Sequence, residues 1–141
     1  MNFAISALRI FFGLHFLVNG LNFFFDFFPV DPGMPKIALD FVAMLVSSGL
    51  IDIVKFVEVG VGIALLANRF VPLAIVAAMP VSIGVAYMDM VLIGGWFVGG
   101  VLGFGTLLLN ALLALAYFSY FRPLLAFRAA PGFALMDERT K

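Results

Sequence analysis

The chain has 141 residues, of which 65% are hydrophobic and 11% are charged, and its formal net charge at pH 7 is zero. A soluble domain is about half apolar and about a quarter charged, so this chain would expose too much apolar surface to water, and its predicted solvent is the lipid bilayer. The lack of cysteine excludes disulfides, thiol redox catalysis and thiolate metal sites within the chain, and the lack of a basic cluster argues against a nucleic-acid partner.

Four stretches are long and apolar enough to cross about 30 Å of hydrocarbon as helices. They cover residues 3–28, 51–67, 71–93 and 101–121. Helices are predicted rather than strands because the runs are long and do not alternate, and because a helix satisfies its own backbone hydrogen bonds. The predicted fold class is therefore all-α: residues 1–141 form one polytopic membrane domain, a bundle of four transmembrane helices.

The segments between these stretches have distinct compositions. Residues 29–35 contain three prolines and a glycine, which end the first helix and predict a turn. Residues 36–48 are apolar but too short to cross and carry Asp40, so they predict a short interfacial or re-entrant helix. Residues 94–100 hold four glycines and Trp96, which predict a flexible connection with an interfacial aromatic ring.

The orientation follows from the basic residues, which are retained on the cytoplasmic side. With four spans, both termini and the connection after residue 67 share one side, and Lys36 lies on the other. We therefore expect cytoplasmic termini, including a tail over residues 122–141, in a bacterial-type inner membrane. The basic residues on that side are Arg69, Arg122, Arg128, Arg139 and Lys141.

Ionisable residues at membrane depth are costly and usually face the bundle interior, so they are the first functional candidates. In the first stretch, His15, Asn19, Asn22 and Asp26 are spaced by four, three and four residues and share one narrow helical face. Two interpretations stay open for this stripe. The asparagines act as packing contacts between helices, or the stripe binds a ligand or relays protons.

The second stretch carries Lys55 and Glu58, which are three residues apart and predict an ion pair. The pair either lets a polar helix insert, or it places Glu58 opposite His15 as a proton or ligand group at matching depth. Arg9 is expected to snorkel to the interface or to reach an acidic partner. On the fourth stretch, Thr106, Asn110 and Tyr117 share a face and are supporting candidates, although threonine and asparagine also serve in helix packing.

Catalytic motifs are missing from the sequence. No Glu-x-x-His pair, His-Glu-x-x-His motif or phosphate-binding glycine loop occurs, so neither a metal nor a nucleotide site is predicted. The single histidine argues against a haem site. The chain alone is therefore not expected to catalyse a reaction.

Two segments resemble DoxX-like membrane proteins. The first is residues 8–24, LRIFFGLHFLVNGLNFF, and the second lies within residues 54–74 and contains, in order, Lys55, Glu58, Gly62, Asn68, Arg69 and Pro72. The resemblance extends over about the first 90 residues. It implies a four-helix membrane protein, with members described as the membrane subunit of thiosulfate:quinone oxidoreductase or as partners in redox-stress complexes. Distant eukaryotic relatives look more like cargo receptors or assembly chaperones.

The favoured hypothesis is a membrane subunit that binds a quinone, or another small lipophilic ligand, for a soluble or membrane redox partner. His15 and Glu58 would exchange protons while Asn19, Asn22 and Arg9 orient the ligand. It predicts a closed polar pocket at mid-depth between the first two stretches, walled by aromatic rings.

A scaffold or assembly partner is the alternative, and it predicts that every buried polar group pairs internally and that no cavity remains. A small-solute transporter needs a continuous polar path and is the least favoured class. The glycines within residues 94–105 are compatible with a homo-oligomer as well as with loop flexibility.

Overall fold

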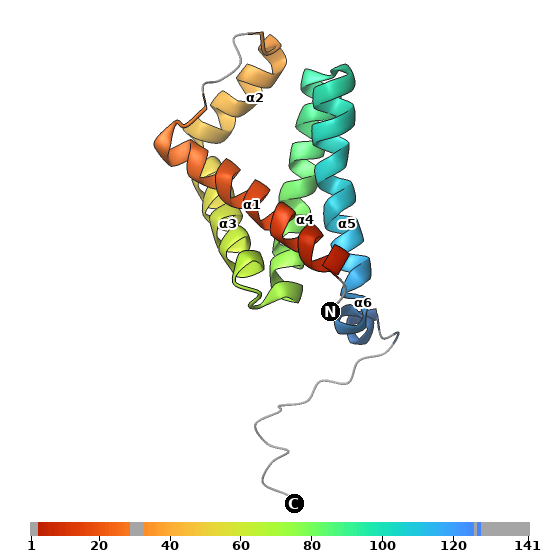
Figure 1. Ribbon diagram of the computed structural model, residues 1–141. Helices are drawn as coiled ribbons and strands as arrows, with labels where there is room; N and C mark the ends of the chain where they lie inside the picture. The colour runs from red at the N-terminus through yellow and green to blue at the C-terminus, as the bar shows by residue number, and fades with distance from the viewer. Residues whose placement is uncertain (1–2, 29–32, 126, 128–141) are drawn as a thin grey trace, which may run out of the picture.

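The computed structural model describes residues 3–28, 33–125 and 127, and within these ranges every regular element is helical (Figure 1). The all-α, multi-pass prediction is thus confirmed. Part of the predicted turn at residues 29–35 and most of the predicted tail lie outside the described residues. The elements are α1 (Phe3–Phe25), α2 (Lys36–Ser47), α3 (Leu50–Leu66), α4 (Val71–Tyr87), the π-helices η1 (Met88–Ile93) and η2 (Gly95–Gly103), α5 (Phe104–Ala116), α6 (Phe118–Phe121) and the 3-10 turn η3 (Arg122–Leu125).

Three helical stretches are long and apolar enough to cross a membrane by themselves. They are α1, the continuous α4–η1 stretch (Val71–Ile93) and the continuous η2–α5 stretch (Gly95–Ala116). The structure has a fourth span if α2 and α3, which meet at an angle of 89°, are counted as one broken span, since α3 by itself has only 17 residues. Gly49 forms the bend with φ of 72°, a left-handed conformation that glycine adopts without strain. The short helix predicted after the first span is α2.

The last span, which was predicted to begin at residue 101, begins at Gly95 in the structure. The prediction of a flexible connection over residues 94–100 is therefore wrong. The helix is broken at Gly94 and Gly95, with φ of 74° and 84°, and η2 begins at Gly95. Two glycines of η2, Gly99 and Gly103, serve close packing against η1 instead of loop formation. A Cβ atom on Gly103 would lie 2.6 Å from Cβ of Asp89, a separation that only glycine permits.

Two helix pairs build the bundle, α1 with α3 and α4 with α5 (Figure 1). Glycines let α1 and α3 approach closely, because a Cβ atom on Gly62 would lie 2.7 Å from the backbone nitrogen of Leu17. The N-terminus, the α3–α4 turn and α6 lie at one end of the molecule, and α2 and the Gly94 turn lie at the other (Figure 1). We call these the terminal end and the α2 end.

The apolar core occupies the half nearer the terminal end. Its fully buried side chains come from all four long helices, since Phe12 lies on α1, Leu65 on α3, Ile75 on α4 and Leu113 on α5. α4 is helical through Pro80. The other half of the bundle contains most of the ionisable residues of the helices, including His15, Lys55 and Glu58.

Candidate functional site

A pocket of about 200 Å³ lies between the helices in the half nearer the α2 end. It takes lining residues from α1, α3, α4, η1, η2 and α5. The polar ones are His15, Asn19, Lys55, Glu58, Asp89 and Thr106.

The prediction that aromatic rings wall the pocket is wrong. Phe16 is the one phenylalanine of the lining, and the remaining apolar lining residues are valine, methionine and leucine. Most phenylalanines of α1, such as Phe11 and Phe25, face outward, where lipid covers them. The pocket is also only partly enclosed, whereas a closed one was expected.

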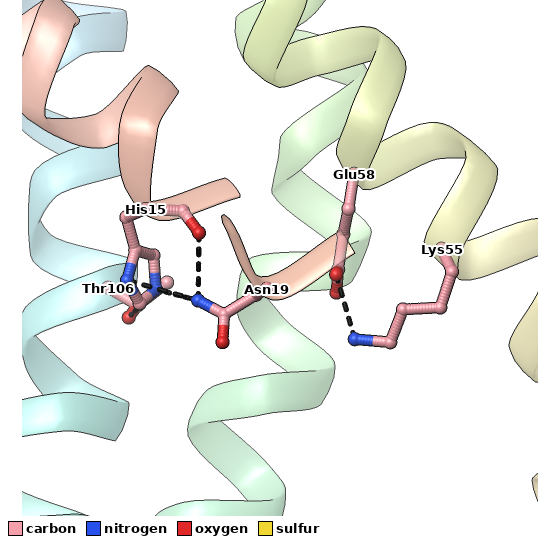
Figure 2. A network of polar contacts seen from close by, with 5 residues as sticks. All are labelled: His15, Asn19, Lys55, Glu58 and Thr106. Atoms are coloured by element: carbon pink, nitrogen blue, oxygen red, sulfur yellow. Dashed lines mark hydrogen bonds and ion pairs between the residues drawn. The ribbon is translucent and has the colours of Figure 1, made fainter. Parts of the chain in front are cut away.

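One wall of the pocket is a hydrogen-bonded group formed by His15, Asn19 and Thr106 (Figure 2). Thr106 Oγ1 donates to the carbonyl oxygen of Leu102 at 2.8 Å and lies 3.3 Å from His15 Nε2. Asn19 Nδ2 lies 3.2 Å from His15 Nδ1 and donates to the His15 carbonyl oxygen at 2.8 Å. Because the threonine proton is committed to Leu102, Nε2 of the imidazole donates to Thr106 and Nδ1 accepts from Asn19.

The opposite wall is the ion pair between Lys55 and Glu58, whose predicted pairing is confirmed (Figure 2). Lys55 Nζ donates to Glu58 Oε2 at 2.8 Å, and the two side chains are 18% and 5% exposed. A buried carboxylate without a partner would be strongly destabilising, so Lys55 is what allows Glu58 to stay charged at this depth. His15 and Glu58 therefore line the same pocket from opposite sides.

Asp89 is a polar residue of the pocket that is not among the candidates predicted from the sequence. It lies on η1, is partly buried and has no ion pair or side-chain hydrogen bond to any described residue. Its position is fixed by the contact with Gly103 described above. One signal was available, because Asp89 is the one acidic or basic residue within residues 71–93, and such a residue in a span is a functional candidate by default.

The polar stripe of α1 is divided by the structure. His15 and Asn19 line the pocket, but Asn22 accepts a hydrogen bond from the backbone nitrogen of Phe28 at 2.7 Å and so closes the turn that follows the helix. Asp26 lies beyond the helix end, exposed and with φ of 49°. Asp26 leaves the polar stripe because α1 ends at Phe25, three residues before the predicted boundary, and Asn22 lies in the last turn of α1, outside the pocket lining.

Three of the supporting candidates, Arg9, Asn110 and Tyr117, lie outside the pocket, in the half nearer the terminal end, whereas Thr106 lines it. Arg9 is buried and donates from Nη1 to the carbonyl oxygen of Leu65 at the end of α3, so it neither snorkels nor reaches an acidic side chain. The side chain of Asn110 lies 2.9 Å from Ser82 Oγ, and both are fully buried between α4 and α5. Tyr117 packs against the apolar core. These three residues have packing roles.

The fold and the pocket together define the class, which is a helical multi-pass membrane protein with a polar site between its spans. The DoxX family model matches residues 4–90, which is more than half of the chain, and the chain belongs to the DoxX family. The matched range contains every polar pocket residue except Thr106. No curated protein and no solved structure matches the chain.

Proposed function

We propose that this protein is the ligand-binding membrane subunit of a redox complex, and that its pocket holds the head group of a quinone or of a similar lipophilic carbonyl compound. One observation carries the proposal. His15 and Glu58, which come from different helices, line one pocket together with further hydrogen-bond donors. Such a group of convergent polar side chains at membrane depth supports a binding role.

The donors suit a ring with carbonyl oxygens on opposite sides. Lys55 Nζ has three protons and uses one on Glu58, and on the other wall the Asn19 proton that points to His15 Nδ1, at the longer distance of 3.2 Å, is the one that would turn to a ligand. The size is suitable as well, because a cavity of about 150 Å³ accepts benzene. A pocket of about 200 Å³ thus fits one substituted ring, with an apolar tail left in the bilayer.

Glu58 and His15 are the groups that would exchange protons with the ligand's oxygens, and Lys55 would hold the carboxylate in place between these events. The electrons have to come from a soluble or membrane partner, because the chain has no cysteine and no haem-type ligand pair. The membership in the DoxX family supports this accessory role.

The orientation is part of the same proposal: both termini face the cytoplasm of a bacterial-type inner membrane. Arg9, Arg69 and Arg122, the arginines of the described residues, belong to the terminal end, whereas Lys36 and Lys55 belong to the α2 end. Arginines at one end of the bundle favour the cytoplasmic side for that end.

The test is equilibrium binding of a short-chain ubiquinone analogue to the purified protein in lipid nanodiscs. We expect His15→Ala and Glu58→Gln each to weaken binding by about tenfold or more, the usual effect of removing a hydrogen bond to a charged or polar pocket group. Asp40→Asn, which neutralises an exposed carboxylate on α2, is the matched control and should bind normally. Wild-type protein without measurable affinity, or unchanged affinity in both pocket variants, would refute the proposal.

A scaffold or assembly partner is the second candidate, and it is supported by the polar contacts that hold helices together without any ligand. The pairs are Asn110 with Ser82 and Arg9 with the carbonyl of Leu65. Stoichiometric co-purification of a soluble enzyme, with no small molecule detected by native mass spectrometry and no quinone binding, would favour it.

A further inference from the structure

The two ends of the bundle carry opposite charge. Among the described residues, the terminal end has three arginines and no acidic residue. The α2 end has two lysines, and each is already paired with a carboxylate: Lys36 with Asp40 at 2.6 Å and Lys55 with Glu58 at 2.8 Å. Three further carboxylates at this end have no ion pair within the described part of the chain. They are Asp26, Asp52 and Asp89.

The pocket is sealed on one side only. Toward the terminal end, the chain fills the space between its helices with fully buried apolar side chains, including Phe12, Leu65 and Leu113. Toward the α2 end, the lining includes polar groups that are only partly buried or exposed, namely Lys55, Asp89 and the amide of Asn19. Water and solutes thus have a polar route to the pocket from the α2 end and none through the core.

We propose that protons and water-soluble solutes reach the pocket from the aqueous phase at the α2 end alone, and that Asp89 is the specificity-determining residue on this route. With Lys55 and Glu58 neutralising each other, Asp89 leaves the pocket with a net negative charge. A cleft with one sign of charge and low-dielectric walls concentrates counter-ions. Protons, organic cations and neutral hydrogen-bond donors are therefore favoured over anionic solutes.

This inference uses the same pocket as the proposed function but does not depend on the identity of its ligand. If the pocket holds a quinone, the protons that reach Glu58 and His15 come from the α2 end, on the side of the membrane opposite the termini. If the pocket holds another molecule, the side of access and the charge selectivity stay the same.

Because the natural chain has no cysteine, single cysteines can report on access from each side of the membrane. Leu102→Cys places the reporter in the pocket without changing a polar group. Trp96→Cys, at an exposed position beside the Gly94 turn, marks the α2 end, and Asn68→Cys, in the α3–α4 turn, marks the terminal end. Ser82→Cys is fully buried and should stay unlabelled.

The probes are membrane-impermeant methanethiosulfonates, one cationic and one anionic, applied to either face of reconstituted vesicles. We expect Leu102→Cys to react from the same side as Trp96→Cys. Its ratio of cationic to anionic labelling rate should exceed that of Trp96→Cys by about tenfold, the lower range for focusing by a charged cleft. Adding Asp89→Asn should reduce that ratio to the value at Trp96→Cys.

Labelling of Leu102→Cys from the side of Asn68→Cys, or from both sides, would overturn one-sided access. A rate ratio that Asp89→Asn leaves unchanged would overturn the role of Asp89. Val85→Cys, which lines the pocket from α4, serves as the reporter if Leu102→Cys does not insert. A short-chain quinone is then added during labelling of Leu102→Cys. If it fails to slow labelling, while the side of labelling and the ratio of cationic to anionic rates are as expected, the result counts against the proposed ligand and not against this inference.

Discussion

Replacing Lys55 with methionine tests how strongly the pocket depends on its ion pair. The substitution keeps the length of the side chain and leaves the Glu58 carboxylate, 5% exposed, without its partner. Removing one member of a buried pair costs about 3–5 kcal/mol, because the remaining charge is uncompensated. We expect the free energy of unfolding of Lys55→Met to fall by an amount in this range.

The chain contains its own control. Lys36 and Asp40 form a pair of the same chemistry on one helix, but their side chains are 86% and 64% exposed. An exposed pair contributes at most about 1 kcal/mol, so Lys36→Met should change stability by no more than that. The measurement is reversible unfolding in mixed micelles, followed by circular dichroism at neutral pH.

A double substitution separates the charge from the packing of the lysine stem. Lys55→Met combined with Glu58→Gln leaves no buried charge, so it should be more stable than Lys55→Met alone, since the coupling between contacting charges is large. Equal losses in Lys55→Met and Lys36→Met, or a double variant less stable than Lys55→Met, would refute the electrostatic explanation.

Two further substitutions test the packing and the end of α1. Gly62→Ala should cost about 1–3 kcal/mol of stability, because its Cβ would lie 2.7 Å from the Leu17 backbone nitrogen. Gly60→Ala is the control and should cost nothing, because its Cβ would have no atom within 4 Å. Equal thermal stability of the two variants would contradict the close helix contact. Asn22→Ala removes the hydrogen bond to the Phe28 backbone and should cost about 1 kcal/mol of stability. It should also speed amide hydrogen exchange at the end of α1 and leave the quinone affinity unchanged. A loss of affinity would show that Asn22 belongs to the binding site.

The sequence is sufficient to predict the structural features that depend on a single helix. The lengths of the apolar runs predict α1 and the stretch Val71–Ile93, because crossing a bilayer sets a minimum length. The spacing of Lys55 and Glu58 predicts their ion pair, because residues three apart are neighbours on a helix.

Features that depend on contacts between helices are not predictable in this way. Glycines over residues 94–100 have the composition of a loop, but in a membrane they also allow a neighbouring helix to approach, and only the position of Asp89 opposite Gly103 decides between the two. Likewise, the spacing from His15 to Asp26 defines a face but not where the helix or the pocket along that face ends. The pocket takes residues from six elements, and that combination is a property of the tertiary structure.

The shortness of α3 has a consequence for the surrounding lipid. Its 17 residues span about 26 Å at 1.5 Å per residue, against about 30 Å for an average hydrocarbon core. The mismatch is accommodated by local thinning of the bilayer or by tilt, each at a modest free-energy cost. Thinning beside α3 brings the lipid head groups nearer to Lys55 and Glu58, so the acyl-chain length of the host membrane sets how far the pocket lies from water. Short-chain lipids should hydrate it, and long-chain lipids should bury it.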